Sequence, residues 1–225
     1  MLRSCPRDVF FDLLDVAGKR VLDVGCGDTD LAHRMAGRGA IAFAIDTKAD
    51  AIEKARAKTP GSGATYQVAP AEDMPFEDGF FDIVIVTNSL HHVAPPLMDR
   101  ALAEAKRVLK PGGTLVVSDP LPEGPRYELT RLIDDEKPER IAAWAAVDRA
   151  ATGMTVEREL DFIDERAFED FDSFRRNVCR NDKRIGAFAA NEDAMRHNFA
   201  NLGFERDGVR YFDQPVRVRV LRKAA

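Results

Sequence analysis

The chain has 225 residues, of which 45% are hydrophobic and 32% charged, which fits one α/β domain with an elaboration. The net charge of -5 and the absence of a Lys/Arg-rich block argue against a nucleic-acid partner. No apolar run approaches the roughly 18 residues that a membrane-spanning helix needs, and no export signal opens the chain. The three cysteines are widely spaced and show no metal-ligand pattern, so we expect a cytoplasmic protein without a metal site.

The first half of the chain alternates short apolar runs with amphipathic helical patterns. Continuous apolar runs are typical of parallel strands covered on both faces, and the helical patterns end at glycine or proline. This alternation predicts a parallel sheet with right-handed crossovers. The expected helices cover 9–16, 31–37, 50–58 and 97–109, and the expected strands cover 19–24, 41–45, 65–68, 81–86 and 114–118.

After Pro120 the pattern changes, and residues 120–187 form a segment too long for a plain connection. We therefore expect a core of residues 1–119 and 188–225, interrupted by a mainly helical insertion over 120–187. Helical patterns cover 127–150, 168–184 and 191–202, a strand pattern covers 155–163, and two final strands over 204–212 and 216–221 join near Asp213-Gln214-Pro215.

The first strand ends in an acid and two glycines, Asp23, Gly25 and Gly27. A buried strand that stops at a Gly-x-Gly turn lets a ligand approach the backbone closely, and the free amides of the next helix face the same space. The alternative is a tight turn without a ligand. A dinucleotide fingerprint would need a third glycine at position 30, where the chain has Asp30.

Polar residues also follow the later strands. Asp46 closes the second apolar run, where a carboxylate can accept two hydrogen bonds from a ribose diol or can cap the next helix. Glu72 follows the third strand and is either a ligand contact or a solvated acid. The fourth strand leads to His91 and His92, which can serve as a base, a substrate contact or a structural element.

Asp23-x-Gly25-x-Gly27 resembles motif I of class I S-adenosylmethionine-dependent methyltransferases, although Thr29 stands where that family often has glycine. The segment 69–76 is similar to the family's Asp-Ala-Glu-x-Leu-Pro-Phe, with Pro70 in place of the leading Asp. The segments 81–92 and 109–113 resemble its Phe-Asp-x-Val…His-His block and its Leu-Lys-Pro-Gly-Gly landmark. Together with Asp46, these landmarks occur in the order typical of the family and span about half of the chain. Within the family, the chain resembles the small-molecule, type-11-like methyltransferase domain.

The resemblance implies a Rossmann-like, seven-stranded, mostly parallel sheet with a reversed last strand and helices on both faces. It also implies S-adenosylmethionine as cofactor and S-adenosylhomocysteine as product. His91 and His92 are the candidates for a general base, if one is needed. The residues expected to bind the cofactor are Asp23, Gly25, Cys26, Gly27, Asp46, Thr47, Ala71, Glu72, Thr87 and Asn88.

The implied reaction is in-line methyl transfer to a small-molecule acceptor, with 120–187 as a lid over the acceptor. The aromatic residues of this segment and its basic residues between 175 and 184 either serve an anionic acceptor or form a lid core with a solvated face, and we favour the second reading. Two other functions remain open: a cofactor-binding regulatory protein without turnover, and a nicotinamide-dependent oxidoreductase. The sequence does not identify the acceptor or the oligomeric state.

Overall fold

The computed structural model describes residues 2–3, 6–28, 30–58, 60–61 and 63–225. Thr29 and Cys5 lie outside the described residues. The chain divides into two compact units. The first, which we call the phenylalanine unit, comprises 1–6, 120–141 and 161–216; the second, which we call the glycine-loop unit, comprises 7–119, 142–160 and 217–225.

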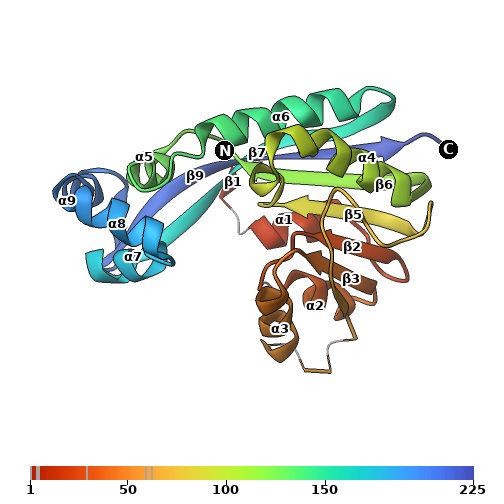
Figure 1. Ribbon diagram of the computed structural model, residues 1–225, viewed down its shortest axis with the longest axis horizontal. Helices are drawn as coiled ribbons and strands as arrows, with labels where there is room; N and C mark the ends of the chain where they lie inside the picture. The colour runs from red at the N-terminus through yellow and green to blue at the C-terminus, as the bar shows by residue number, and fades with distance from the viewer. Residues whose placement is uncertain (1, 4–5, 29, 59, 62) are drawn as a thin grey trace. The chain divides into compact units, whose positions relative to one another are not determined.

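The centre of the glycine-loop unit is a set of parallel strands. Strand β2 pairs with β3 and with β5, β3 pairs with β4, and β5 pairs with β6, all in parallel. The order β6-β5-β2-β3-β4 means that the chain builds outward from β2 on one side and then on the other (Figure 1). Ligands of such sheets bind at this switch point, beside the carboxyl ends of the strands. The bounds are β2 (Arg20–Val24), β3 (Ile41–Asp46), β4 (Thr65–Val68), β5 (Phe81–Thr87) and β6 (Leu109–Pro120).

The two central strands, β2 and β5, are buried over most of their length, as the predicted fold requires. Val21 and Leu22 are both inaccessible to solvent, and so are Val84 and Ile85. Because successive side chains point to opposite faces, continuous burial means that both faces of the sheet are covered. The covering helices of this unit include α1 (Pro6–Leu13), α2 (Leu31–Ala36), α3 (Ala49–Lys58) and α4 (Met98–Val108), and short 3-10 turns lie at Leu90–His92 and Pro95–Leu97.

The last long strand, β9 (Val209–Lys223), runs antiparallel to β6, which confirms the predicted reversal. Within the glycine-loop unit the Gly112 amide donates to the Ala224 carbonyl, and within the phenylalanine unit the Leu121 amide donates to the Pro215 carbonyl. Residue numbers therefore rise on one strand as they fall on the other. In the sheet β9 lies between β6 and β7 (Met154–Phe168), and the short strands β1 (Leu2–Arg3) and β8 (Phe204–Arg206) extend the described sheet beyond the seven strands expected.

The predicted turn at Asp213-Gln214-Pro215 is wrong. The hairpin turns at Asp207-Gly208, with Arg206 opposite Val209, and both turn residues have positive φ, 53° and 74°. An Asp-Gly pair in this conformation matches the twist of two antiparallel strands. Strand β9 instead passes through Pro215, where the Gln214 side chain donates to the Leu121 carbonyl at 2.9 Å.

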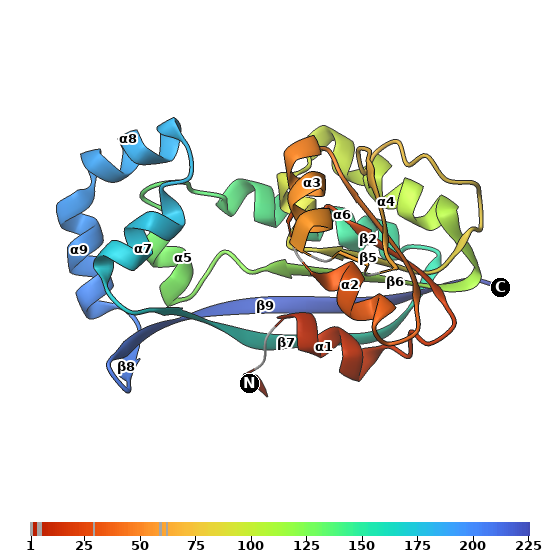
Figure 2. The same ribbon diagram turned by 90° about the horizontal axis from the view of Figure 1, so that it is seen from below.

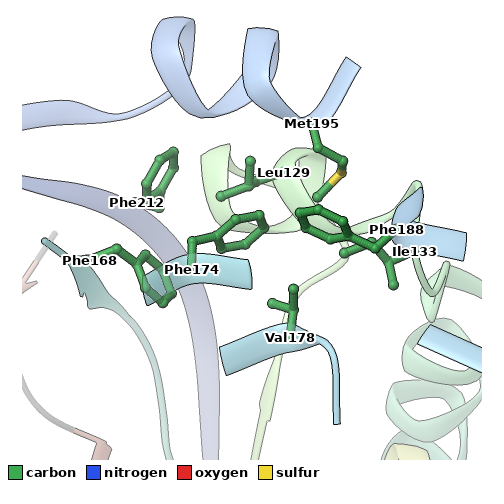
Figure 3. Close-up of a cluster of buried hydrophobic side chains, with 8 residues drawn as sticks. All are labelled: Leu129, Ile133, Phe168, Phe174, Val178, Phe188, Met195 and Phe212. Carbon is green, nitrogen blue, oxygen red and sulfur yellow. The ribbon is translucent and has the colours of Figure 1, made fainter. Parts of the chain in front are cut away.

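The phenylalanine unit has its own apolar core. Its helices α5, α7, α8 and α9 gather together in both views (Figures 1 and 2), and their aromatic rings pack at centroid distances such as 5.6 Å for Phe171–Phe188. Figure 3 shows the buried cluster, which consists of Leu129, Ile133, Phe168, Phe174, Val178, Phe188, Met195 and Phe212. The bounds are α5 (Pro125–Thr130), α7 (Phe171–Val178), α8 (Asp182–Ala190) and α9 (Glu192–Asn201).

Two helices predicted as continuous are divided in the structure. The expected helix over 168–184 becomes α7 and α8 because each has its own cap: Asp170 accepts from the Ser173 amide, and Asn181 accepts from the Arg184 amide. The expected helix over 127–150 becomes α5 and α6 (Lys137–Ala151). The strand pattern over 155–163 is confirmed within the longer β7. No helix among the described residues is long and apolar enough to cross a membrane.

Candidate cofactor site

The loop after β2 is held against the end of β3. The amides of Gly25 and Cys26 both donate to the Ile45 carbonyl, at 2.8 and 3.0 Å. Gly25 and Gly27 have φ of +72° and +56°, a left-handed conformation that glycine adopts at little cost. The loop therefore turns sharply at the switch point of the sheet, where the sequence predicts a ligand.

The two glycines serve different purposes. A Cβ at Gly25 would lie 2.5 Å from the Cβ of Ser89, whose hydroxyl donates to the Val24 carbonyl at 2.8 Å. A Cβ at Gly27 would meet no atom of the described residues within 4 Å. Gly25 is thus required by packing inside the protein, whereas Gly27 leaves open space beside the loop that a ligand can approach.

Asp46 joins the end of β3 to the glycine loop. Its Oδ2 accepts from the Gly27 amide at 2.8 Å, and its Oδ1 accepts from the Lys48 amide at 2.9 Å. The second bond is the helix-capping role expected as the alternative, so the carboxylate serves the loop and the next helix together. An ionised carboxylate offers about four acceptor positions, so each oxygen of Asp46 can accept a further hydrogen bond from a ligand hydroxyl.

Asp23 is the most unusual group in this unit. Its side chain is 1% exposed, and neither carboxyl oxygen has a hydrogen-bond partner among the described residues. Burial, and then the charge of Asp46, raise the pKa of Asp23 to about 7. A buried carboxyl without a donor is costly and rare. The residues present therefore fit a ligand that brings a cationic or hydroxyl donor to the end of β2.

Cys26 and Thr47, two further residues expected to bind the cofactor, differ in exposure. Cys26 is buried, and its Sγ lies 3.5 Å from the Gly27 carbonyl oxygen. Burial, together with the charges of Asp23 and Asp46, raises the pKa of the Cys26 thiol. Thr47 is exposed directly after Asp46.

The turn after β4 contains Ala71 and Glu72, both half-buried. The Ala69 amide donates to the Asp46 carbonyl at 3.0 Å, which brings the start of this turn to the end of β3. Farther on, the Arg107 guanidinium donates to the Met74 and Phe76 carbonyls at 3.0 and 2.8 Å. Sequence reasoning missed Arg107 because its partners lie about thirty residues away.

The end of β5 brings Thr87 and Asn88 to the same edge of the sheet. Asn88 adopts a left-handed φ of 51°, and its amide donates to the Ser118 carbonyl at 2.7 Å. Thr87 is half-buried and Asn88 is exposed. This turn ends the strand beside Ser89, the residue that packs against Gly25.

The histidine pair divides into a buried and an exposed residue. His91 is 3% exposed, its Nδ1 lies 3.1 Å from Asp119 Oδ1, and its amide donates to Asp119 Oδ2 at 3.1 Å. His92 is exposed, with its ring centroid 4.0 Å from that of His91. Sequence reasoning missed Asp119, although an acid that closes a buried apolar strand is the same signal that singled out Asp46.

Comparison with known proteins identifies the family that the glycine-loop segment of the chain matches. Residues 22–117 match the family described as methyltransferase domain. The chain is 34% identical over 152 residues to a fatty-acid O-methyltransferase from Mycolicibacterium smegmatis, an alignment that covers 67% of this chain and 54% of the relative. It is 41% identical over 106 residues to a ubiquinone biosynthesis O-methyltransferase from Thiobacillus denitrificans, which covers 46% and 45% of the two chains. The chain spans between 34% and 54% of the length of the first curated relatives that it matches.

Solved structures agree in fold. The YcgJ protein from Bacillus subtilis superposes with a TM-score of 0.67 at 20% identity, over 97% of this chain and 98% of that one. An S-adenosylmethionine-dependent methyltransferase from Mesorhizobium loti superposes with a TM-score of 0.56 at 17% identity, over 96% of both chains. Residues 22–117 of this chain are therefore a methyltransferase domain of the class I, S-adenosylmethionine-dependent family, as the sequence motifs predict.

Proposed function

We propose that this chain transfers the methyl group of S-adenosylmethionine to an oxygen atom of a small-molecule acceptor. The observation that carries the proposal is a combination of three features around the glycine loop. The buried carboxyl of Asp23 has no partner among the described residues, the space beside Gly27 is open, and the Asp46 carboxylate accepts from the Gly27 amide. The names of two relatives as O-methyltransferases support oxygen as the acceptor atom.

Each group has a distinct part in holding the cofactor. Asp46 would accept from the ribose hydroxyls, for which it keeps acceptor positions beyond its bonds with Gly27 and Lys48. Asp23 would accept from the ammonium of the methionine portion, because its buried carboxyl has no donor among the described residues. Ala71 and Glu72 would line the adenine, and Thr87 and Asn88 the methionine end. The bound cofactor supplies an activated methyl group, so the protein mainly orients the acceptor and excludes water.

A hydroxyl acceptor must lose its proton, and we assign His91 as the base that takes it. Asp119 lies 3.1 Å from Nδ1, where it fixes the orientation of the ring and stabilises the imidazolium that forms. His92 is exposed, and we assign it no proton transfer.

The cofactor assignment is tested by calorimetry with S-adenosylhomocysteine. We expect the wild-type chain to bind it and Asp46→Ala to show no detectable binding, because the substitution removes both the ribose acceptor and the anchor of the Gly27 amide. Asp50→Ala is the matched control, since Asp50 is an exposed acid on α3 that pairs with Lys54. Unchanged affinity in Asp46→Ala contradicts the assignment, and so does preferential binding of NADH.

Methyl transfer itself is tested by mass spectrometry with a panel of hydroxylated and carboxylic small molecules. We expect one compound class to gain a methyl group in the presence of S-adenosylmethionine. Cofactor binding without methylation of any acceptor would favour the alternative, a cofactor-binding protein without turnover.

A further inference from the structure

The phenylalanine unit contains an arginine that no acid neutralises. Arg126 lies in the short helix α5, and its Nη1 is inaccessible to solvent and has no hydrogen-bond partner among the described residues. Its guanidinium makes no ion pair with those residues either. Arg126 as a whole is half-buried, and buried guanidinium nitrogens are normally paired, so the unpaired Nη1 favours an anionic partner.

The neighbouring arginines make this exception informative. Each is paired with its own carboxylate: Arg140 with Glu136 at 2.8 Å, Arg166 with Asp164 at 2.6 Å and Arg184 with Asp134 at 2.7 Å. The basic residues at 175–184 that the sequence offered for an anionic acceptor are likewise paired in part, since Lys183 also contacts Asp134. Among Arg126 and the three arginines whose charges act on it, Arg126, which the sequence did not single out, is the one without a carboxylate among the described residues.

The electrostatic surroundings favour an added negative charge. Burial and the charges of Arg166, Arg140 and Arg184 lower the pKa of Arg126 to about 9, and Asp164 offsets this only in part. An anion at the guanidinium would relieve the repulsion among these cations and would replace the hydrogen bonds that burial removed.

Two phenyl rings lie close to the guanidinium of Arg126. The Phe168 and Phe174 ring centroids lie 5.3 and 5.8 Å from its central carbon, and both rings belong to the buried cluster drawn in Figure 3. A phosphate recruits several donors, whereas this position offers one guanidinium beside phenyl rings. A carboxylate on an apolar body fits both features, because its two oxygens match the planar fork and its apolar body suits the phenyl rings beside the guanidinium.

We infer that Arg126, Phe168 and Phe174 form a binding site for the carboxylate of a ligand with an apolar body. The inference concerns the phenylalanine unit and does not rest on the proposed methyl transfer, because ligand binding is measured without S-adenosylmethionine.

The test is calorimetry of the full chain with decanoate, decanol and decyl phosphate as probes. We expect decanoate to bind saturably, decanol to bind at least about tenfold more weakly, and Arg126→Met to weaken decanoate by at least about tenfold, as for the loss of a charge-assisted hydrogen bond. Arg126→Lys, which keeps the charge but not the planar fork, should lie between these values.

Arg196→Met is the matched control. Arg196 also stacks on a phenylalanine of this unit, with its guanidinium carbon 4.3 Å from the Phe171 centroid, but it is paired with Glu192 at 2.8 Å. We expect this variant to bind decanoate within about twofold of the wild-type affinity, since its guanidinium is already satisfied.

Folding is checked by thermal unfolding. Arg126→Met should unfold at or above the wild-type temperature, because an apolar side chain replaces an unpaired buried charge. The inference is overturned if decanoate does not bind, if decanol binds as well, if Arg126→Met retains the wild-type affinity, or if only decyl phosphate binds.

Discussion

The side chain of Ser89 occupies the place that a side chain at Gly25 would need, because a Cβ there would lie 2.5 Å from the Ser89 Cβ. Gly25→Ala should therefore lower the free energy of unfolding by about 2–4 kcal/mol, the combined cost of overpacking and of a left-handed conformation. It should also weaken S-adenosylhomocysteine binding, because the loop can no longer keep its position against Ile45. Urea unfolding and calorimetry measure the two effects.

Gly61→Ala is the control for Gly25→Ala. Gly61 has the same φ of +72°, but a Cβ there would meet nothing within 4 Å in the part of the chain that the structure describes. This variant should show only the conformational cost, about 1 kcal/mol, and unchanged cofactor affinity. Equal losses in the two variants would mean that contact with Ser89 is not the reason for glycine at position 25.

Asp23→Asn should stabilise the free protein and weaken cofactor binding. The pKa of Asp23 rises from its ordinary 3.8 to about 7 in the folded protein, so the native state retains a proton that the unfolded chain has lost between these values. The wild-type free energy of unfolding should therefore fall as pH rises from 4 to 7, by up to about 4 kcal/mol from this group, and then level off.

The asparagine variant lacks that pH dependence, because its side chain does not titrate. Urea unfolding of both proteins at several pH values isolates the difference, which should be largest above pH 7. S-adenosylhomocysteine should bind the variant at least about tenfold more weakly, as for a lost charge-assisted hydrogen bond. A variant that binds as tightly as the wild type would remove Asp23 from the cofactor site.

His91→Gln should lower kcat about a hundredfold for the best acceptor of the panel, which is within the range for loss of a general base. The affinity for S-adenosylhomocysteine should stay nearly unchanged. We expect the kcat of the wild type to rise with pH, as for a reaction with a general base, and this rise to disappear in His91→Gln. His92→Gln should retain most of the activity, because Asp119 contacts the ring of His91 and the ring of His92 is exposed. If the two variants lose activity equally, His91 has no special part in proton transfer.

Arg107→Met should loosen the turn that contains Ala71 and Glu72. The substitution removes hydrogen bonds to the Met74 and Phe76 carbonyls and the ion pair with Glu104, so the free energy of unfolding should fall by about 2 kcal/mol. Hydrogen exchange should accelerate over residues 71–78. Arg100→Met is the control on the same helix, because Arg100 is largely exposed and lies 3.9 Å from Asp73. A uniform acceleration of exchange in both variants would argue against this local role.

The parallel core was predictable because its signals are local. Each central strand is a continuous apolar run, and the loops at Gly25 and Asp46 follow directly from those runs in the sequence. The predicted hairpin failed because a Pro-containing segment was taken for the turn, although Asp207-Gly208 has the stronger turn chemistry. A backbone carbonyl paired with Leu121 and a side-chain amide donor let β9 continue past Pro215.

Other features depend on contacts between distant residues. Asp119 is singled out by its contact with His91, and Arg107 by its hydrogen bonds to the Met74 and Phe76 carbonyls. No sequence spacing rule connects these positions. The same holds for Arg126, since what distinguishes it is the absence of a pairing that its neighbours have. Sequence patterns indicate which residues can form such contacts, but only the fold shows which of them do.

Cys26 lies between the two glycines of the loop, and a thiolate in that position would be the strongest nucleophile near a sulfonium methyl group. Burial and the charges of Asp23 and Asp46 keep this sulfur protonated, and a thiol reacts far more slowly than a thiolate. If Asp23 and Asp46 hold the cofactor as proposed, the same two carboxyl groups would also protect the protein from alkylating itself.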